Sequence, residues 1–273
     1  KTKIPATTIH GALRKVPDDD YVFYNSKNLL PYRLIIVDES SMVDTSLMYD
    51  LLSAVEKSSK IIFVGDHNQL YPVGYGEPFF DFMKTLEVYR LTINHRQAEG
   101  TDILNNAKNA LAGMPLECGR GVTVRHISFM EIGDLLTRDE DTQIISPYND
   151  LNRQINAFLR KGEEQLNEGD KIMTIRNTKS YCNGDIGTVV SADSKGVTIE
   201  IEGKRIVVKN SHRKDITLAY AITVHKMQGS EAKRVMVFLP ENDSMVDKRL
   251  LYTAVTRARE ELEVYYYTNP MEE

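Results

Sequence analysis

Short runs of β-branched and aliphatic residues alternate with helix-like stretches along most of this chain. The runs that predict strands are 34–38, 61–65, 87–91 and 142–146, and the stretches that predict helices are 44–57, 78–85, 101–112 and 149–160. Strands that alternate with helices are typical of βαβ units, in which a helix connects two parallel strands. We therefore expect an α/β protein built on parallel sheets.

The pattern changes after "LNEGDKIMTIRN", where closely spaced strands follow one another without helices. Turns rich in Gly, Asp and Ser separate "GDIGTVVSAD", "GVTIEIEG" and "KRIVVKN", which indicates a small antiparallel barrel or meander over 166–212. The α/β rhythm then returns with the strand "RVMVFLP", a helix through "KRLLYTAVTRAREE" and a last strand "LEVYYYT". This β module is thus expected to be inserted in an α/β domain. The Gly-containing stretch 112–121 is the expected hinge between two α/β lobes.

Composition indicates a general class but names no partner. The 273 residues are 41% hydrophobic and 27% charged, as in a soluble globular protein of one large or two ordinary domains. The net charge of −5 does not decide on nucleic-acid binding, because a local groove can be basic on an acidic protein. Cys118 and Cys182 have no CxxC or Cys/His spacing, so neither a disulfide framework nor a zinc site is indicated. The lack of a signal pattern and of a run long enough to span a bilayer predicts a cytoplasmic protein without a membrane partner.

Asp38 and Glu39 directly follow the apolar run "LIIV", which places both acids at the carboxyl end of a parallel strand. This edge is where α/β sheets bind ligands. One carboxylate there can hold a magnesium ion while its neighbour orients or deprotonates the attacking water, which suits phosphoanhydride cleavage. Two adjacent acids are a weak signal by themselves. The alternative is an exposed strand end followed by a helix N-cap in "DESS".

A second expected strand ends in Gly65-Asp66, and Gln69 follows three residues later. The glutamine amide can donate to a phosphate oxygen and accept from a water. The glycines in "PVGYGE" allow the backbone to pass close to a ligand. The string alone is compatible with an ordinary βα loop, but one strand after Asp38-Glu39 it can face the same cleft.

Arg257 and Arg259 lie near the expected end of the helix in "LLYTAVTRARE". The guanidinium fork matches phosphate oxygens, so an arginine from a second lobe can stabilise charge on a transferring γ-phosphoryl group. The alternative is that helix-terminal arginines complement the helix dipole and pair with Glu260 or Glu261. For Arg259 we prefer this alternative.

Taken in order, these strings resemble the motifs of superfamily 1 helicases, specifically the RecD-like branch that includes Dda-like helicases. "ATTIHGAL" resembles motif Ia, "LIIVDESSMVD" motif II and "VGDHNQLYPVGYGE" motif III. "LTINHRQ" resembles motif IV, "AITVHKMQGSE" motif V and "LLYTAVTRARE" motif VI. The six ordered matches extend over nearly the whole chain, so coincidence is not a serious alternative for the family.

The resemblance implies ATP and Mg²⁺ as cofactors and a role for several residues. Asp38 is expected to bind Mg²⁺ and Glu39 to activate the hydrolytic water. Gln69 is expected to sense the γ-phosphate, while Arg96 and Arg257 reach that phosphate from the two sides of the cleft. Glu231 is expected to contact the nucleotide sugar. The residues expected to face single-stranded DNA are Thr8, His10, Thr223 and His225, although a lone histidine is more often structural.

The family fold comprises two RecA-like lobes of the P-loop NTPase type, and the β module fits the SH3-like barrel that RecD-like helicases carry in the second lobe. The expected divisions are 1–112 for lobe one, 113–165 and 213–273 for lobe two, and 166–212 for the module. The branch implies 5′-to-3′ polarity. The stretch 15–32 falls where Dda-like proteins have a strand-splitting pin, and its aromatic residues Tyr21, Phe23 and Tyr24 either stack on a base or cover the lobe.

The chain departs from the family because it contains no G-x-x-x-x-G-K-[ST] string. The only Gly-Lys pair, Gly203-Lys204, is followed by Arg205 within the β module. We expect a fragment that begins after the P-loop, with an incomplete first lobe that exposes apolar surface unless the N-terminal segment or another subunit covers it. Such a fragment would be inactive by itself. The competing hypotheses are a non-catalytic module that binds nucleic acid or a partner, and a motor subunit of a recombination nuclease complex.

Overall fold

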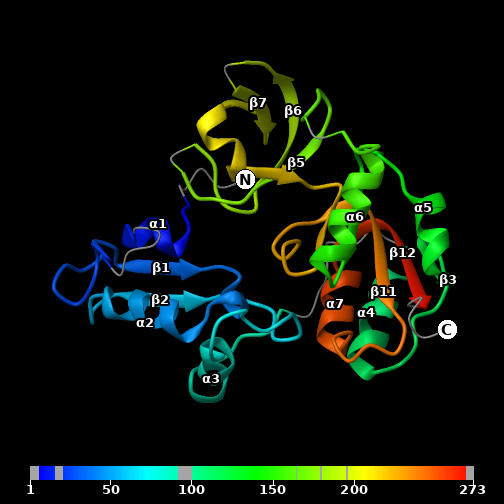
Figure 1. Ribbon diagram of the computed structural model, residues 1–273. Coiled ribbons are helices and arrows are strands. Elements are labelled where there is room, and N and C mark those ends of the chain that lie inside the picture. The colour runs from blue at the N-terminus through cyan, green and yellow to red at the C-terminus, as the bar shows by residue number, and fades with distance from the viewer. Residues whose placement is uncertain are drawn as a thin grey trace. The chain divides into compact units, whose positions relative to one another are not determined.

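The computed structural model describes residues 6–15, 21–91, 100–163, 165–178, 180–194 and 196–268 (Figure 1). The chain divides into two compact units, Lys1–Ile93 and Asn94–Glu273, here called unit 1 and unit 2. This division corrects the expected lobe boundary at 112/113. The helix α4 (Ile103–Ala112) packs against α7 (Lys248–Val255) and β12 (Ala258–Thr268), so it belongs to unit 2.

Unit 1 contains a two-stranded parallel sheet of β1 (Leu34–Val37) and β2 (Lys60–Phe63). The helices are α1 (Ile9–Leu13), the 3-10 turn η1 (Ser40–Met42), α2 (Thr45–Ser53) and α3 (Pro78–Thr85). One face of the sheet packs on a core that includes Leu13, Met48 and Leu51. The prediction of a strand at 87–91 is wrong, because these residues form no strand and Leu91 is 96% exposed.

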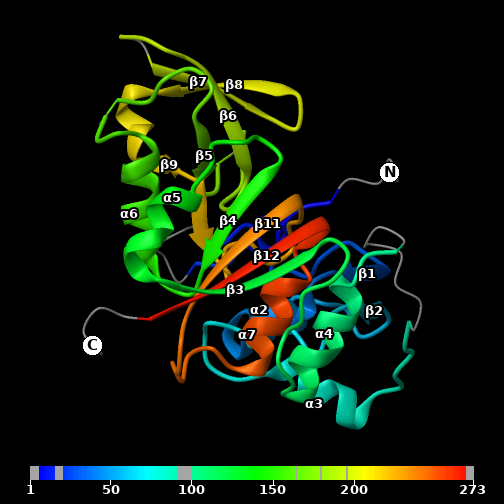
Figure 2. The same ribbon diagram turned by 90° about the vertical axis from the view of Figure 1, so that its right-hand side faces the viewer.

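Unit 2 is built on a five-stranded parallel sheet with the order β10-β4-β11-β12-β3. The strands are β3 (Val122–Ser128), β4 (Thr142–Ser146), β10 (Ala221–Thr223), β11 (Ala232–Pro240) and β12. The helix α6 (Asn149–Leu159) packs on one face, near α5 (Ile132–Leu135) and the 3-10 turn η2 (Phe129–Glu131), while α4 and α7 lie on the other side (Figure 2). The nearly continuous apolar strand β11 is buried from Val235 to Pro240, as expected for a central strand covered on both faces.

The β module follows α6 and ends before β10, so in the chain it interrupts the parallel sheet. Its antiparallel sheet has the order β8-β7-β6-β5-β9. The strands are β5 (Lys171–Thr174), β6 (Ile186–Ala192), β7 (Gly196–Ile201), β8 (Lys204–Lys209) and β9 (Ile216–Leu218), with the 3-10 turn η3 (Asn210–Asp215) before β9. The module has a core of its own, which includes Ile172, Val189 and Ile199. The last strand therefore extends the module beyond the expected end at 212.

No helix in the part of the chain that the structure describes is long and apolar enough to cross a membrane.

Candidate functional site

Asp38 and Glu39 lie where β1 ends and η1 begins. The Asp38 carboxylate is exposed, and its Oδ1 accepts a hydrogen bond of 2.9 Å from the Glu39 backbone N–H. Glu39 has a φ of 50°, a left-handed conformation that costs energy for a residue with a Cβ. The buried Ser40 fixes this turn, because its backbone N–H donates to the carbonyl of Val64 at 2.8 Å and its hydroxyl donates to that of Val37 at 2.7 Å.

The loop after β2 lies beside this turn. The backbone N–H of Val64 donates to the Val37 carbonyl at 2.8 Å, and a Cβ added at Gly65 would lie 3.0 Å from the Ser41 backbone nitrogen. A side chain at residue 65 would therefore push the two loops apart. The two loops therefore follow the carboxyl ends of neighbouring parallel strands, and the expectation that they face one ligand cleft stays a prediction.

Gln69 is 3% exposed and is held by the loop that carries it. Its Nε2 donates to Asp66 Oδ2 at 3.5 Å, and its backbone N–H donates to the Asp66 carbonyl at 3.2 Å. Sequence reasoning noted Gly65-Asp66 only as a strand end and missed that Asp66 positions Gln69. The sequence did contain a signal for this contact, because a polar side chain follows an Asp by three residues, a spacing that is common in turns.

The glycine-containing loop after Gln69 packs against the start of α2. The Thr45 backbone N–H donates to the Tyr75 carbonyl at 3.0 Å. A Cβ at Gly74 would lie 2.0 Å from Asp44 Oδ2, and one at Gly76 would lie 2.0 Å from Thr45 Oγ1. The glycines thus allow the loop to pack on the start of α2, where Asp44 caps the helix by accepting from the Leu47 N–H.

Asp38 is the residue expected to hold Mg²⁺. Among the described residues, no group of three or more His, Cys, Asp or Glu side chains could hold a metal ion. Mg²⁺ commonly binds one or two carboxylates and completes its shell with substrate phosphates and water. A single exposed carboxylate at a strand end fits that chemistry.

His10 lies on α1 of unit 1, and Thr8 directly precedes this helix. Thr8 is the N-cap residue, and its hydroxyl accepts a hydrogen bond of 3.1 Å from the Gly11 N–H. His10 is exposed on the same short helix. The Thr8 side chain therefore has a structural role, while the His10 ring is accessible to a ligand.

Thr223 is the last residue of β10 in unit 2, and His225 lies in the turn that follows. The Thr223 hydroxyl is part of a turn in which it accepts from the Lys226 N–H at 3.3 Å. Burial lowers the pKa of the half-buried His225, and the charge of Asp247 opposes this effect only in part. The partial burial of His225 therefore disfavours the charged form of its imidazole.

Arg257 does not lie in the expected helix, because α7 ends at Val255. The side chain is 1% exposed. Its Nε donates to the Thr253 carbonyl at 3.0 Å, its Nη1 to the Ser230 carbonyl at 3.1 Å and its Nη2 to Thr256 Oγ1 at 3.1 Å. Arg257 thus connects the segment after β10 with the end of α7.

Arg259 lies in β12, where it is 52% exposed and 3.7 Å from the carboxylate of Glu231. This ion pair corrects the expectation that Arg259 pairs with Glu260 or Glu261, because the strand directs its side chain to a different neighbour. Glu231, the expected sugar contact, is exposed enough to exchange this partner for a ligand. Arg96 lies outside the described residues.

The stretch considered as a pin is described except for residues 16–20. Tyr24 packs against the core of unit 1, and the guanidinium of Arg14 lies 5.0 Å from the Phe23 ring and 5.6 Å from the Tyr24 ring. Tyr21 is 56% exposed. Of the three aromatic residues, Tyr24 therefore covers the unit, whereas Phe23 and Tyr21 are exposed.

Comparison with known proteins gives two family matches. Residues 1–120 match the model described as an AAA domain, and residues 218–265 match the UvrD-like helicase C-terminal domain. The ATP-dependent RecD2 DNA helicase of Deinococcus radiodurans is 29% identical over 284 residues, which are 93% of this chain and 39% of that protein. The RecBCD enzyme subunit RecD of Mycolicibacterium smegmatis is 32% identical over 317 residues, which are 96% of this chain and 55% of that protein.

Among solved structures, the Pif1 helicase from Bacteroides in complex with ADP-AlF3 and ssDNA superposes with a TM-score of 0.66 and 19% sequence identity, over 94% of this chain and 78% of that one. The parallel sheets and the carboxylates at a strand end define an α/β protein with RecA-like helicase lobes. The chain belongs to the RecD-like branch of the superfamily 1 helicases. It spans from 39% to 55% of the length of these two curated relatives.

Proposed function

We propose that this chain is the motor region of an ATP-dependent DNA helicase that moves 5′-to-3′ on single-stranded DNA in the cytoplasm. The observation that carries the proposal is the pair Asp38-Glu39 on a fixed turn beside the loop that holds Gln69. The name of the D. radiodurans relative, an ATP-dependent DNA helicase, supports the reaction. The ssDNA in the Bacteroides Pif1 complex supports the substrate.

The residue roles follow from this proposal. Asp38 would hold Mg²⁺, which supplies charge stabilisation at the β- and γ-phosphates. Glu39 would orient and deprotonate the attacking water, and Gln69 would sense the γ-phosphate. Arg96 and Arg257 would contact that phosphate, and Glu231 the sugar. The residues that would face DNA are Thr8, His10, Thr223 and His225.

We further propose that hydrolysis requires a phosphate-binding segment that these 273 residues do not contain, since no G-x-x-x-x-G-K-[ST] string is present. The β module would correspond to the SH3-like barrel of the second lobe. The 273-residue chain alone is expected to show negligible ATPase activity. Robust hydrolysis by this purified chain would contradict the assignment of the site.

The test is DNA-stimulated ATPase activity of a longer form that includes a phosphate-binding segment. Glu39→Gln should reduce kcat by roughly 10²–10⁴-fold, the usual contribution of a positioned general base, and leave ssDNA binding intact. Glu56→Gln is the matched control, because Glu56 is an exposed glutamate after α2 in the same unit. Equal activity of Glu39→Gln and wild type would refute the role of Glu39.

A second function is that of a motor subunit in a recombination nuclease complex. It is favoured by the M. smegmatis relative, which is named as a subunit of the RecBCD enzyme. Co-purification of other subunits with the native protein would support it. A third possibility, a non-catalytic nucleic-acid-binding module, predicts ssDNA binding without any ATPase activity in the longer form.

A further inference from the structure

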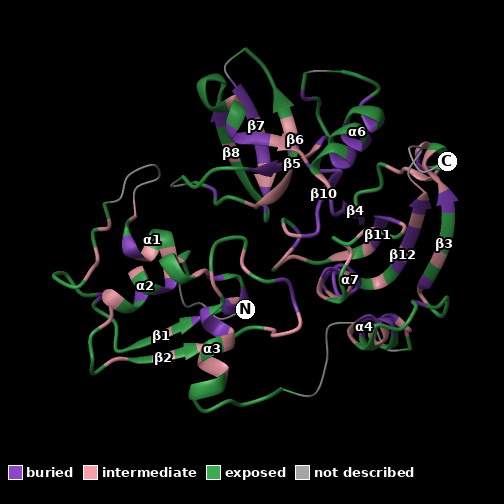
Figure 3. Cartoon of the chain, turned by 60° about the horizontal axis from the view of Figure 1, so that its bottom comes forward, coloured by how far each residue is buried: buried purple, intermediate pink, exposed green. Residues whose placement is uncertain are grey.

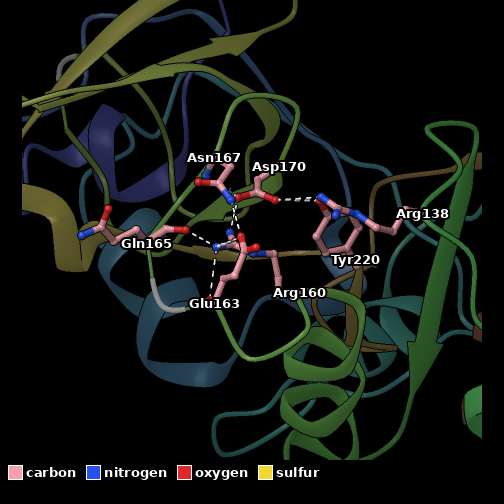
Figure 4. Close-up of polar contacts among 7 residues, drawn as sticks. All are labelled: Arg138, Arg160, Glu163, Gln165, Asn167, Asp170 and Tyr220. Carbon is pink, nitrogen blue, oxygen red and sulfur yellow. Dashed lines mark hydrogen bonds and ion pairs between the residues drawn. The ribbon is translucent and has the colours of Figure 1, made fainter.

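The parallel sheet of unit 2 and the helices that cover it are here called the α/β part. The chain passes twice between this α/β part and the β module, and one buried carboxylate lies where these two connections meet (Figure 4). Asp170, which directly precedes β5, lies on the outgoing connection and is 0% exposed. Tyr220, between β9 and β10, lies on the return connection and is 6% exposed. Arg138 and Arg160 come from the α/β part, before β4 and at the end of α6.

Both carboxylate oxygens of Asp170 are occupied. Oδ1 accepts from the Tyr220 hydroxyl at 2.8 Å and from Arg138 Nη2 at 3.1 Å. Oδ2 accepts from the Asn167 backbone N–H at 2.6 Å and from Arg160 Nη1. A single side chain therefore binds the outgoing connection, the return connection and two elements of the α/β part.

Arg160 provides the buried countercharge and is 2% exposed. Its Nη2 donates to the carbonyls of Glu163, at 3.1 Å, and Gln165, which fixes the path of the chain as it leaves α6. Its Nε has no hydrogen-bond partner among the described residues. The guanidinium of Arg138 also lies over the Tyr220 ring at 5.1 Å, so the return connection is held by a second arginine.

The backbone of Asp170 belongs to the β module, while its side chain binds the α/β part. The Val189 N–H donates to the Asp170 carbonyl at 2.9 Å, and the Gly169 N–H donates to the Val189 carbonyl at 2.8 Å. Val189 is a core residue of the module. A rotation of the module relative to α6 would therefore break the contacts of the buried carboxylate.

The contribution of this buried ion pair to stability is distinct from the orientation that its hydrogen bonds impose on the β module. A buried ion pair often stabilises a protein no more than well-packed apolar residues would, but removal of one partner leaves an uncompensated buried charge. A directional set of hydrogen bonds to one carboxylate permits only one arrangement of its donors, whereas apolar contacts can slide. We propose that Asp170 is a positioning residue that holds the β module in one orientation on the α/β part of unit 2.

The first test uses the two cysteines of the sequence, Cys118 and Cys182, which are both free and exposed. Cys118 precedes β3 in the α/β part, and Cys182 lies in the β module, so spin labels on both report the distance between the two parts. Labelling requires mildly alkaline pH, because burial and the nearby Asp185 raise the pKa of the Cys182 thiol. The wild-type chain should give a narrow distance distribution and Asp170→Asn a broad one.

Asp215→Asn is the matched control. Asp215 is a second buried acid, 3% exposed, but its side chain binds Tyr181 at 3.2 Å and His212 at 3.1 Å within the module itself. This variant should retain the narrow distribution even if the module becomes less stable. An equally narrow distribution for Asp170→Asn would overturn the proposal.

The double substitution Arg160→Met/Asp170→Leu separates positioning from stability. Removal of both charges should restore the midpoint of thermal unfolding that Asp170→Asn lowers. The proposal expects the distance distribution to remain broad in this stable variant. If the distribution became as narrow as in wild type, the charges would only stabilise, and the proposal would be wrong.

One consequence rests on the proposed function. In the longer, active form, Asp170→Asn should retain DNA-stimulated ATPase activity but unwind fewer base pairs per ATP hydrolysed, because the module no longer follows the α/β part as one body. Unwinding per ATP equal to wild type would exclude this consequence. If the wild-type longer form hydrolysed no ATP, the proposed function would fail, while the spin-label distances would still decide the role of Asp170.

Discussion

Arg257 illustrates how one residue can have a structural role besides the proposed contact with a phosphate. Its guanidinium holds the Ser230 carbonyl and the Thr253 carbonyl in a buried arrangement. We expect Arg257→Lys to lower the free energy of unfolding by about 1–3 kcal/mol without any nucleotide, because an ammonium group cannot satisfy these separated acceptors. Urea unfolding of the 273-residue chain measures this change.

Arg259→Gln is the control for that substitution. Its ion pair with Glu231 is 3.7 Å long and solvent-exposed, so its loss should change the free energy of unfolding by less than about 1 kcal/mol. If Arg257→Lys unfolded like wild type, the buried hydrogen bonds would not stabilise unit 2.

Some of these residue positions could be predicted from sequence and others could not. An apolar run that ends in two acids is a local pattern, so Asp38 and Glu39 were correctly placed at a strand end. The burial of Arg257 depends on Ser230, which is distant in the chain, and no local pattern indicates such a contact. The Asp170 contacts were missed for the same reason, since Arg138, Arg160 and Tyr220 meet only in the folded chain.

At the scale of elements, the strand β12 gives the protein a predicted sensitivity to alkali. Burial, aided for Tyr265 by its hydrogen bond to Glu263, raises the pKa of Tyr265 and of Tyr267 from 10.0 to about 12. Between these values the unfolded chain loses phenol protons that the folded protein retains. The contribution to stability is therefore complete below pH 10.0 and is lost as the pH rises to about 12.

Thermal unfolding followed by circular dichroism at a series of pH values measures this loss. The double variant Tyr265→Phe/Tyr267→Phe should show a smaller fall in its unfolding midpoint over that pH range. Tyr49→Phe is the control, because Tyr49 is 70% exposed. An unchanged pH dependence in the double variant would show that other groups cause the alkaline unfolding.

The elements themselves were predicted best where periodicity and flanking turns agree. The expected strands at 34–38 and 142–146 and the expected helix at 149–160 correspond to β1, β4 and α6. The run 87–91 has strand-forming residues but no partner strand among the described residues, and sequence alone does not reveal whether a partner exists. The end of α7 was placed too late, because residues 256–260 have no helix breaker although they turn into β12.

At the scale of the whole molecule, sequence identified the α/β class and the position of the β module better than the boundary between units. The Gly-containing stretch 112–121 has the composition of a hinge. The contacts of α4 with α7 nevertheless place the division between Ile93 and Asn94. Tertiary packing of an amphipathic helix thus outweighs the local composition that follows it.

The sheet of unit 1 exposes apolar side chains on one face. Ile36 and Ile62 are paired in register and are 62% and 48% exposed, and exposed residues alternate with more buried ones along both strands (Figure 3). Parallel sheets are normally covered on both faces. This exposed apolar surface should therefore promote self-association of the 273-residue chain and binding of an apolar dye. We expect Ile36→Thr/Ile62→Thr to reduce concentration-dependent association in sedimentation velocity without a lower unfolding midpoint.

The neighbouring position on the same strand provides the control. Ile61 packs against the core of unit 1 on the opposite face of the sheet. Ile61→Thr should lower the free energy of unfolding by about 1–3 kcal/mol, because it places a hydroxyl against apolar neighbours, and should not reduce association. If Ile36→Thr/Ile62→Thr destabilised the protein as much as Ile61→Thr, the two faces would be equally covered. The apolar face of β1 and β2 would then not be the surface through which the chain associates.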